Sequence, residues 1–279
     1  AALTGGCHYP WQCEGFHTDC SNCPAIFTNS KKNIAKKNLD YKKANIPENL
    51  ELLAHSASDY ERALKASLFK EKKVHKLTAA IDPVKFAPGD KALAKAHFGI
   101  DPATRVIFYQ KKGERQVVEA LKLLKKKMMN SVDKKKKKDD FMILIAGNDG
   151  EEYFSKIDIP YKRVGYLNEE NLIKAYQAAD FSLSPSLEDS GPLMVNQCIM
   201  CGTPVVAFNT GVAIDLVHTG ETGYIAKLFD SADLAVGIQY MLSLSDEELK
   251  QMSVNCRNLA LRTFTPDIYI NKLMSLFKS

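Results

Sequence analysis

The sequence predicts an α/β protein built on a doubly wound parallel sheet. Two observations lead to this prediction: short continuous apolar runs alternate with amphipathic stretches of helix length, and polar or Gly-rich loops follow the apolar runs. The chain has 279 residues, 45% of them hydrophobic and 25% charged, so we expect a sizeable core and exclude wholesale disorder. No run approaches the roughly 20 apolar residues that a membrane-spanning helix requires.

The first part of the chain is expected to hold two short strands and one helix. A Cys-rich loop and a basic amphipathic stretch at residues 31–43 come first, the strands span residues 50–54 and 73–77, and the helix spans residues 59–68. Ser58 is the expected N-cap of this helix, because its hydroxyl can accept a hydrogen bond from an unpaired backbone N–H. Pro83, Pro88 and Gly89 then interrupt the pattern, which predicts a domain linker.

Beyond the linker, strands and helices alternate regularly. Strands are predicted at residues 105–109, 141–146, 162–166, 181–184, 204–208 and 224–226. Helices are predicted at residues 113–127, 151–157, 169–179, 192–201, 232–242 and 246–262. Ligands bind beyond the carboxyl ends of the strands in such sheets, so the candidate loops follow Tyr109, Gly147, Tyr166, Ser186 and Phe208.

The net charge of +5 comes mainly from lysine, because only six of the 38 basic residues are arginine. The run from Lys134 to Lys138 is flanked by Asp133 and by Asp139-Asp140, which partly neutralise it. We therefore interpret it as a flexible loop and expect no nucleic-acid partner. Peripheral contact with an anionic membrane surface remains open.

The cysteines fall into two groups. Four lie in the N-terminal loop, namely Cys7, Cys13, Cys20 and Cys23. Four thiolates at such spacing can close a tetrahedral zinc site, and two disulfides or four free thiols are the alternatives. No secretory signal is recognisable among these residues, so we expect the disulfides to be disfavoured. Cys198, Cys201 and Cys256 lie in apolar helical contexts and are expected to be buried as small hydrophobes.

The segment that follows the strand at residues 181–184 carries the strongest functional signal. It continues into the acidic pair Glu188-Asp189 and a Ser190-Gly191 turn, and a helix begins immediately afterwards. The first backbone N–H groups of that helix have no intrahelical partner and lie at the positive end of the helix dipole. Such a helix start is a candidate phosphate site.

Individual residues of this segment receive separate roles. Leu193 and Met194 supply the unpaired N–H groups, and Gln197 on the second turn is placed to face the same cleft. Glu188 and Asp189 would repel a phosphate, so we expect them to contact sugar hydroxyls instead. The simpler alternative is that both acids cap the helix, where each would contribute about 0.3–1 kcal/mol.

With these residues the segment resembles the signature of the family 4 retaining glycosyltransferases, which have a GT-B architecture of two Rossmann-like domains. The family motif places an acidic residue eight positions before a Glu, and Asp189 and Gln197 hold that offset, with Glu188 as an alternative first acid. The helix then leads to Cys201-Gly202-Thr203-Pro204, as in the family. Gln197 departs from the family Glu, which usually holds the donor ribose hydroxyls, so donor strength and nucleotide preference stay open.

Other segments resemble the family in the expected order. Lys112-Gly113 resembles the pair whose lysine binds the donor diphosphate, and Gly165-Tyr166-Leu167 resembles the strand end that contacts the base in the family. We expect the backbone of Tyr166 to meet the ligand while its ring packs in the core. The start of the chain, Thr4 to Tyr9, resembles a subgroup that builds bacterial surface polysaccharides.

The resemblance implies a domain division and a truncation. Residues 1–85 are expected to be the C-terminal part of the acceptor domain, residues 86–262 the donor domain, and residues 263–279 a helix that crosses back to the first domain. The early strands of the acceptor domain are expected upstream of Ala1, so this piece is expected to bind donor and to lack turnover on its own.

The implied reaction is transfer of a sugar from a nucleotide diphosphate sugar to a glycan or lipid-linked acceptor with retention of configuration. Lys112 and Glu188 would be the catalytic residues, with Lys112 and the helix start stabilising the leaving diphosphate. No catalytic metal is expected, and the implied location is cytoplasmic, with the inner face of the membrane as a variant. A nucleotide-sugar epimerase and a zinc-stabilised binding module without activity are the alternatives.

Overall fold

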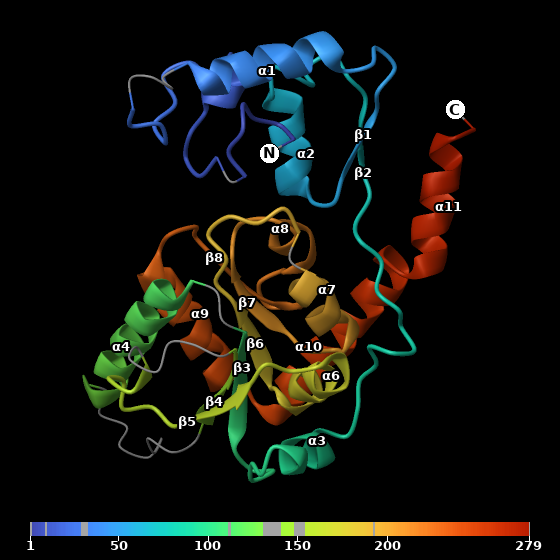
Figure 1. Ribbon diagram of the computed structural model, residues 1–279. Coiled ribbons are helices and arrows are strands. Elements are labelled where there is room, and N and C mark those ends of the chain that lie inside the picture. The colour runs from blue at the N-terminus through green and yellow to red at the C-terminus, as the bar shows by residue number, and fades with distance from the viewer. Residues whose placement is uncertain are drawn as a thin grey trace.

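The chain forms two parallel sheets of very different size, joined by a long extended segment (Figure 1). The computed structural model describes residues 2–8, 10–28, 33–110, 113–130, 141–147, 154–191 and 193–278. The predictions for Lys112, for Tyr9, for the run at 134–138 and for the start of the helix at 151–157 lie outside these residues.

The larger sheet has six parallel strands in the order β5-β4-β3-β6-β7-β8. The strands are β3 (Arg105–Gln110), β4 (Phe141–Ala146), β5 (Tyr161–Gly165), β6 (Phe181–Ser184), β7 (Val205–Phe208) and β8 (Gly223–Ala226). The order runs outward in both directions from β3 and β6, so the topological switch point lies between these two strands. The predicted α/β class with a parallel sheet is therefore confirmed.

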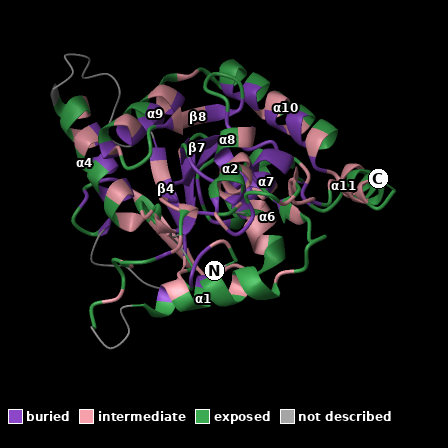
Figure 2. Ribbon diagram, turned by 90° about the horizontal axis from the view of Figure 1, so that it is seen from above, coloured by how far each residue is buried: buried purple, intermediate pink, exposed green. Residues whose placement is uncertain are grey.

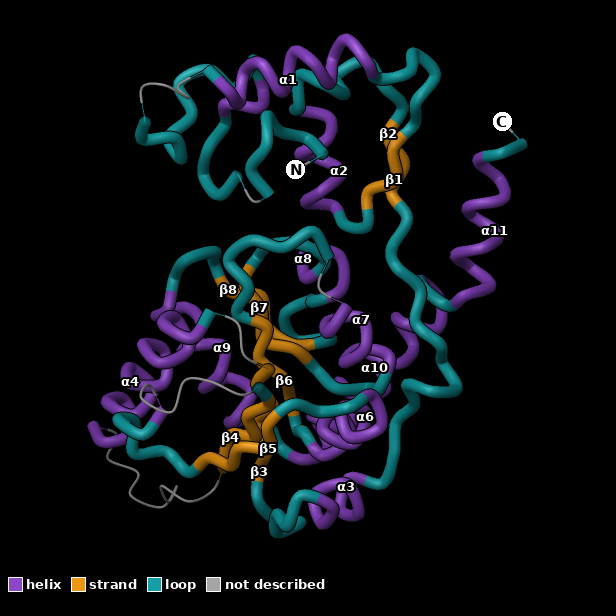
Figure 3. Tube along the Cα trace, viewed as in Figure 1, coloured by secondary structure: helices purple, strands orange, loops and turns teal. Residues whose placement is uncertain are grey.

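Helices cover both faces of this sheet (Figure 3). One face packs against α4 (Glu114–Asn130) and α9 (Ser231–Ser243); the other packs against α3 (Lys91–His97), α6 (Glu169–Ala178), α7 (Leu193–Met200) and α8 (Ala213–Leu216). Helix α10 (Asp246–Thr263) contributes residues to both cores. Successive residues of β3 enter opposite cores, with Ile107 and Tyr109 on the α4 side and Val106 and Phe108 on the α6 side. This two-sided burial explains why the strand reads as a continuous apolar run.

The N-terminal unit, residues 2–76, contains the smaller sheet. It consists of η1 (Gly15–His17), α1 (Ile34–Asn45), β1 (Leu52–Ala54), α2 (Ala57–Lys65) and β2 (Val74–Lys76), and the two strands pair in parallel. The N-cap of α2 is Ser56, whose hydroxyl accepts the Asp59 N–H at 3.1 Å, so the prediction of Ser58 is wrong. Ser56 has the extended backbone that a cap requires, whereas Ser58 already lies within the helix.

The connection between the two units is fixed to the body of the C-terminal unit. Arg257 donates hydrogen bonds to the carbonyls of Pro83 and Phe86, and the Ile81 N–H donates to the Phe264 carbonyl at 3.0 Å.

The last helix, α11 (Pro266–Leu276), then runs back beside the N-terminal unit and has no buried residue (Figure 1). Seen from above, burial concentrates in the larger sheet, while α1 exposes most of its surface (Figure 2). No helix in the described ranges combines the length and apolarity needed to cross a membrane.

Candidate functional site

The loop of residues 185–191, which we call the signature loop, leaves β6 at the switch point of the larger sheet. Gly113, which opens the helix after β3, lies directly against it. Gly113 has φ +63°, and a Cβ atom at this position would stand 2.3 Å from the Pro185 carbonyl oxygen. Only glycine tolerates both the conformation and the contact, so the loops after β3 and β6 meet where a crevice is expected.

Glu188 points from the signature loop toward the N-terminal unit. Its side chain is 3% exposed, and its Oε1 lies 3.0 Å from Nη1 of Arg62 on α2. Burial raises the pKa of Glu188, while Arg62 and a hydrogen bond from the Trp11 backbone N–H oppose that rise. Oε1 accepts no well-aligned hydrogen bond from any described residue, so the ion pair is its principal compensation.

Asp189 is buried and organises the loop itself. Its Oδ1 accepts the Gly191 N–H at 3.1 Å, and its Oδ2 accepts the Ser186 hydroxyl at 3.3 Å. The two neighbouring acids therefore face different partners. Asp189 holds the turn, and Glu188 meets the N-terminal unit.

Ser190 joins the signature loop to the start of α2. The Ser56 hydroxyl donates to the Ser190 carbonyl at 2.8 Å, and the Ser190 hydroxyl bonds to the Asp59 carboxylate. Burial raises the pKa of Asp59 to about 6, against the lowering effects of Arg62, His55 and this hydroxyl.

Asp59 and Arg62 were not among the functional residues predicted from the sequence. They lie three positions apart on a predicted helix, which places them on one face, and this was the available signal.

A second contact ties α8 to the same helix start. Asp215 accepts the Ala57 N–H at 2.7 Å through Oδ2 and the Lys76 ammonium at 2.6 Å through Oδ1. The carboxylate thus satisfies an unpaired donor at the N-terminus of α2.

Helix α7 presents the remaining predicted residues. Leu193 is half exposed at its start and Met194 is buried. The Gln197 Oε1 accepts a hydrogen bond of 3.0 Å from the hydroxyl of Tyr176, a buried residue of α6. Burial raises the pKa of Tyr176 well above its ordinary value, so the phenol remains a donor.

Tyr166 follows β5 at the edge of the larger sheet and is 84% exposed. The expectation of a core ring is therefore wrong. An edge strand has a neighbour on one side only, so the residue just beyond its end meets no covering helix. The ring stands instead at the carboxyl edge of the sheet.

The four N-terminal cysteines lie in one hydrogen-bonded loop. The Gly5 N–H donates to Cys20 Sγ at 3.3 Å, the Gly15 N–H donates to Cys13 Sγ at 3.4 Å, and all the thiols are free. Burial raises the pKa of Cys20. In the described part of the chain, no group of three or more His, Cys, Asp or Glu residues is arranged to hold a metal ion, so the structural zinc stays a prediction.

The other three cysteines confirm their predicted burial. Cys198, Cys201 and Cys256 all lie in the core on the α6 side of the sheet. Burial raises the pKa of Cys201 to about 12, which keeps its thiol protonated and unreactive.

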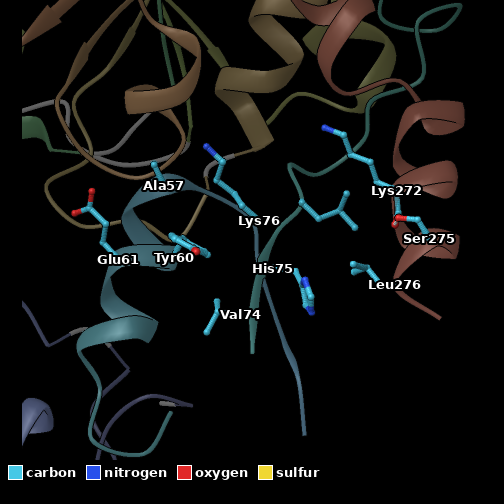
Figure 4. Close-up of a pocket in the computed structure, with 10 residues that line it drawn as sticks. Ala57, Tyr60, Glu61, Val74, His75, Lys76, Lys272, Ser275 and Leu276 are labelled. Atoms are coloured by element: carbon cyan, nitrogen blue, oxygen red, sulfur yellow. Dashed lines mark hydrogen bonds between the residues drawn. The ribbon is translucent and has the colours of Figure 1, made fainter. Parts of the chain in front are cut away.

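Among the described residues, two of the cavities border the N-terminal unit. One of about 180 Å³ lies against the signature loop and includes Ser190, Asp59 and Arg62 in its lining. A larger one of about 460 Å³ lies away from that loop, between α2, β2 and α11 (Figure 4). Glu61 of α2 and Lys272 of α11 line opposite sides of this larger cavity.

Comparison with known proteins identifies relatives of both sequence and fold. The family described as "Glycosyl transferases group 1" matches residues 107–259. The D-inositol 3-phosphate glycosyltransferase of Rhodococcus jostii is 24% identical over 210 residues, covering 71% of this chain and 46% of the relative. The chain thus spans about half the length of the curated relatives it matches.

Solved structures share the fold at low sequence identity. Sucrose-phosphate synthase from Thermosynechococcus elongatus has a TM-score of 0.71 at 18% identity, covering 94% of this chain and 66% of its own. The Anabaena protein HepE, solved in complex with UDP-glucose, has a TM-score of 0.66 at 17% identity, covering 87% of this chain and 68% of its own.

Proposed function

The chain belongs to the family of glycosyl transferases group 1, and from this membership we propose that it binds a nucleotide diphosphate sugar and takes part in moving the sugar to an acceptor. The acceptor would be a glycan or a lipid-linked sugar in bacterial surface-polysaccharide synthesis, and transfer would retain configuration. One observation carries the proposal: the acidic signature loop and the α7 N-terminus stand at the switch point between β3 and β6.

The α7 N-terminus would hold the diphosphate. The backbone N–H groups of Leu193 and Met194 lack intrahelical partners, and the helix dipole favours the negative charge that develops on the leaving group. Lys112 would add a cationic charge from the neighbouring loop. This stabilisation acts most strongly as the bond to the sugar breaks, because the charge on the diphosphate then grows.

Gln197 and Tyr166 would hold the nucleoside. The Gln197 Oε1 already accepts the Tyr176 hydroxyl, so the side-chain NH₂ group is the part left to donate to ribose oxygens. This explains how an amide can stand where the family has a carboxylate. Tyr166, exposed at the end of β5, would lie beside the base.

Glu188 would contribute from the interface between the two units. Arg62 and the Trp11 N–H hold its carboxylate, and the adjacent cavity opens toward Ser190. We therefore assign Glu188 to the transferred sugar and its hydroxyls, at the point where donor and acceptor would meet. No metal is assigned to this step.

Ligand-dependent thermal stabilisation tests the donor proposal. UDP-glucose is the first donor to try, since HepE was solved with it, followed by other UDP-, GDP- and ADP-sugars. A nucleotide at about 100 times its Kd is expected to stabilise the chain by about 2.7 kcal/mol and to raise Tm by several degrees.

A matched pair of variants localises the donor. Gln197→Ala is expected to weaken binding, whereas Gln251→Ala, which changes an exposed glutamine on α10, is expected to leave it unchanged. The donor proposal is wrong if no nucleotide or nucleotide sugar shifts Tm. The ribose assignment is wrong if both variants bind like the parent chain.

A further inference from the structure

The small cavity beside the signature loop has a lining suited to an uncharged, hydroxyl-rich ligand. Its volume is about 180 Å³, and its polar side chains come from Thr4, His8, Asp59, Arg62 and Ser190. Leu52 and Ala63 supply part of an apolar wall. Donors, acceptors and an apolar surface are therefore within reach of one small molecule.

The charged residues of this cavity connect directly to the proposed donor site. Asp59 and Arg62 lie on one face of α2, three positions apart. Asp59 bonds to the Ser190 hydroxyl, and Arg62 pairs with Glu188 at 3.0 Å. A ligand in the cavity would thus touch the turn that precedes α7.

We propose that this cavity binds one sugar ring of the acceptor, with the Asp59 carboxylate accepting a hydrogen bond from a ring hydroxyl and the Arg62 guanidinium donating to an oxygen of the same ring. The inference rests on the proposed function, because it assigns the second substrate of that reaction. It adds the chemical class of the acceptor group, a neutral sugar, and the residues that recognise it.

Volume and charge both favour a neutral sugar ring. Pockets for drug-sized ligands measure about 300–1,000 Å³, so the size of this cavity favours a single ring over a whole nucleotide or an acyl chain. The Asp59 carboxylate repels phosphate, and the Arg62 charge is already balanced by Glu188. An anionic ligand would therefore bind less well than a neutral one.

The ionisation of Asp59 gives the site a pH dependence. Burial and Asp189 raise its pKa, while Arg62, His55 and the Ser190 hydroxyl lower it, with a net value of about 6. Above this value the carboxylate accepts hydrogen bonds only, and below it the group gains a proton. Sugar binding is expected to change between about pH 7 and 5 for this reason.

Binding of the chain to an array of immobilised mono- and disaccharides, with UDP present, tests the assignment. The parent chain is expected to bind a subset of neutral sugars at pH 7.5, and Asp59→Asn is expected to weaken that binding at least about tenfold, the effect of one lost charge-assisted hydrogen bond. Glu61→Gln is the matched control, because Glu61 lies on the same helix and lines the larger cavity instead (Figure 4). UDP affinity and Tm are measured for each variant.

The outcomes separate this inference from the donor proposal. Loss of sugar binding in Asp59→Asn with unchanged UDP affinity, and a pH dependence between 7 and 5 that this variant lacks, support the acceptor site. Unchanged sugar binding in Asp59→Asn, or no sugar binding by a chain that binds UDP, overturns the acceptor site and leaves the donor proposal standing. Failure of UDP to bind counts against the donor proposal alone.

Discussion

The pair of Arg62 and Glu188 gives the sharpest test of how the two units are held together. Arg62→Met removes the cation and keeps much of the apolar stem, so Glu188 is left with a 3% exposed carboxylate. Breaking a fully buried ion pair costs about 3–5 kcal/mol. Because the Arg62 side chain is 24% exposed, we expect a cost at or below the lower end of that range, about 2–3 kcal/mol.

A double-mutant cycle isolates the interaction from other effects of the substitution. In a Glu188→Gln background, Arg62→Met is expected to cost less than about 1 kcal/mol, which gives a coupling energy of about 1–3 kcal/mol at pH 7.5. Burial raises the pKa of Glu188, so its protonation reduces the coupling as the pH is lowered. Urea unfolding at pH 7.5 and in acid solution measures both effects.

The matched control is the pair of Arg105 and Asp246. Its atoms approach to 2.9 Å, slightly closer than those of the buried pair, but the Asp246 side chain is 99% exposed. We expect its coupling to be close to zero, since solvent screens exposed pairs. Equal coupling for the two pairs, or none for Arg62 and Glu188, would refute the argument that burial decides their strength.

Three further predictions concern the turn, the acid and the thiols. Gly113→Ala is expected to lower the free energy of unfolding by more than about 1 kcal/mol, because the new Cβ combines a positive φ with a clash against backbone atoms. Gly220→Ala is the control: φ is also positive there, but the nearest atom would lie 3.8 Å from the new Cβ, so the loss measured by urea unfolding should be smaller. The folded state holds the Asp59 proton more tightly than the unfolded state, so its ionisation lowers stability as pH rises from about 4 to 6. Asp59→Asn should therefore be about 1–2 kcal/mol more stable than the parent at pH 7 and no more stable at pH 4. If the variant and the parent have equal urea midpoints at both pH values, this prediction is wrong. Metal analysis is expected to find about one zinc per chain, lost in Cys20→Ser and kept in Cys256→Ser; a zinc-free parent chain with reactive thiols would rule the site out.

Local pattern accounts for the strands that were predicted well. The run Phe141 to Ala146 and the run Phe181 to Ser184 both form strands at the predicted residues. Each lies in the interior of the sheet between two neighbours, so its side chains are largely buried on both faces. The first run is apolar throughout, whereas the second buries Ser182 and Ser184, and the Ser182 hydroxyl donates to the Phe108 carbonyl at 3.2 Å. Ser56 and Ser58 were harder to distinguish, because two serines near a helix start have similar capping chemistry and the backbone angle selects between them.

Placement at the surface was less predictable. Tyr166 has the composition of a core residue, yet it lies beyond an edge strand where nothing covers the ring. Edge and interior positions depend on strand order, which no local pattern contains. The helices α3 and α8 were missed because they are short and carry too few residues for a helical period to appear.

The sequence by itself determined the fold class, the parallel sheet and the loop that carries the functional signal. These properties follow from short-range pattern, because apolar periodicity and helix-start chemistry act over a few residues. Only the tertiary structure decided which neighbours the two acids of that loop meet. Asp189 bonds within its own turn, while Glu188 pairs with Arg62, which is remote in sequence. A buried charge must find its partner wherever folding brings one close, so the interface and the cavity beside it became visible only in three dimensions.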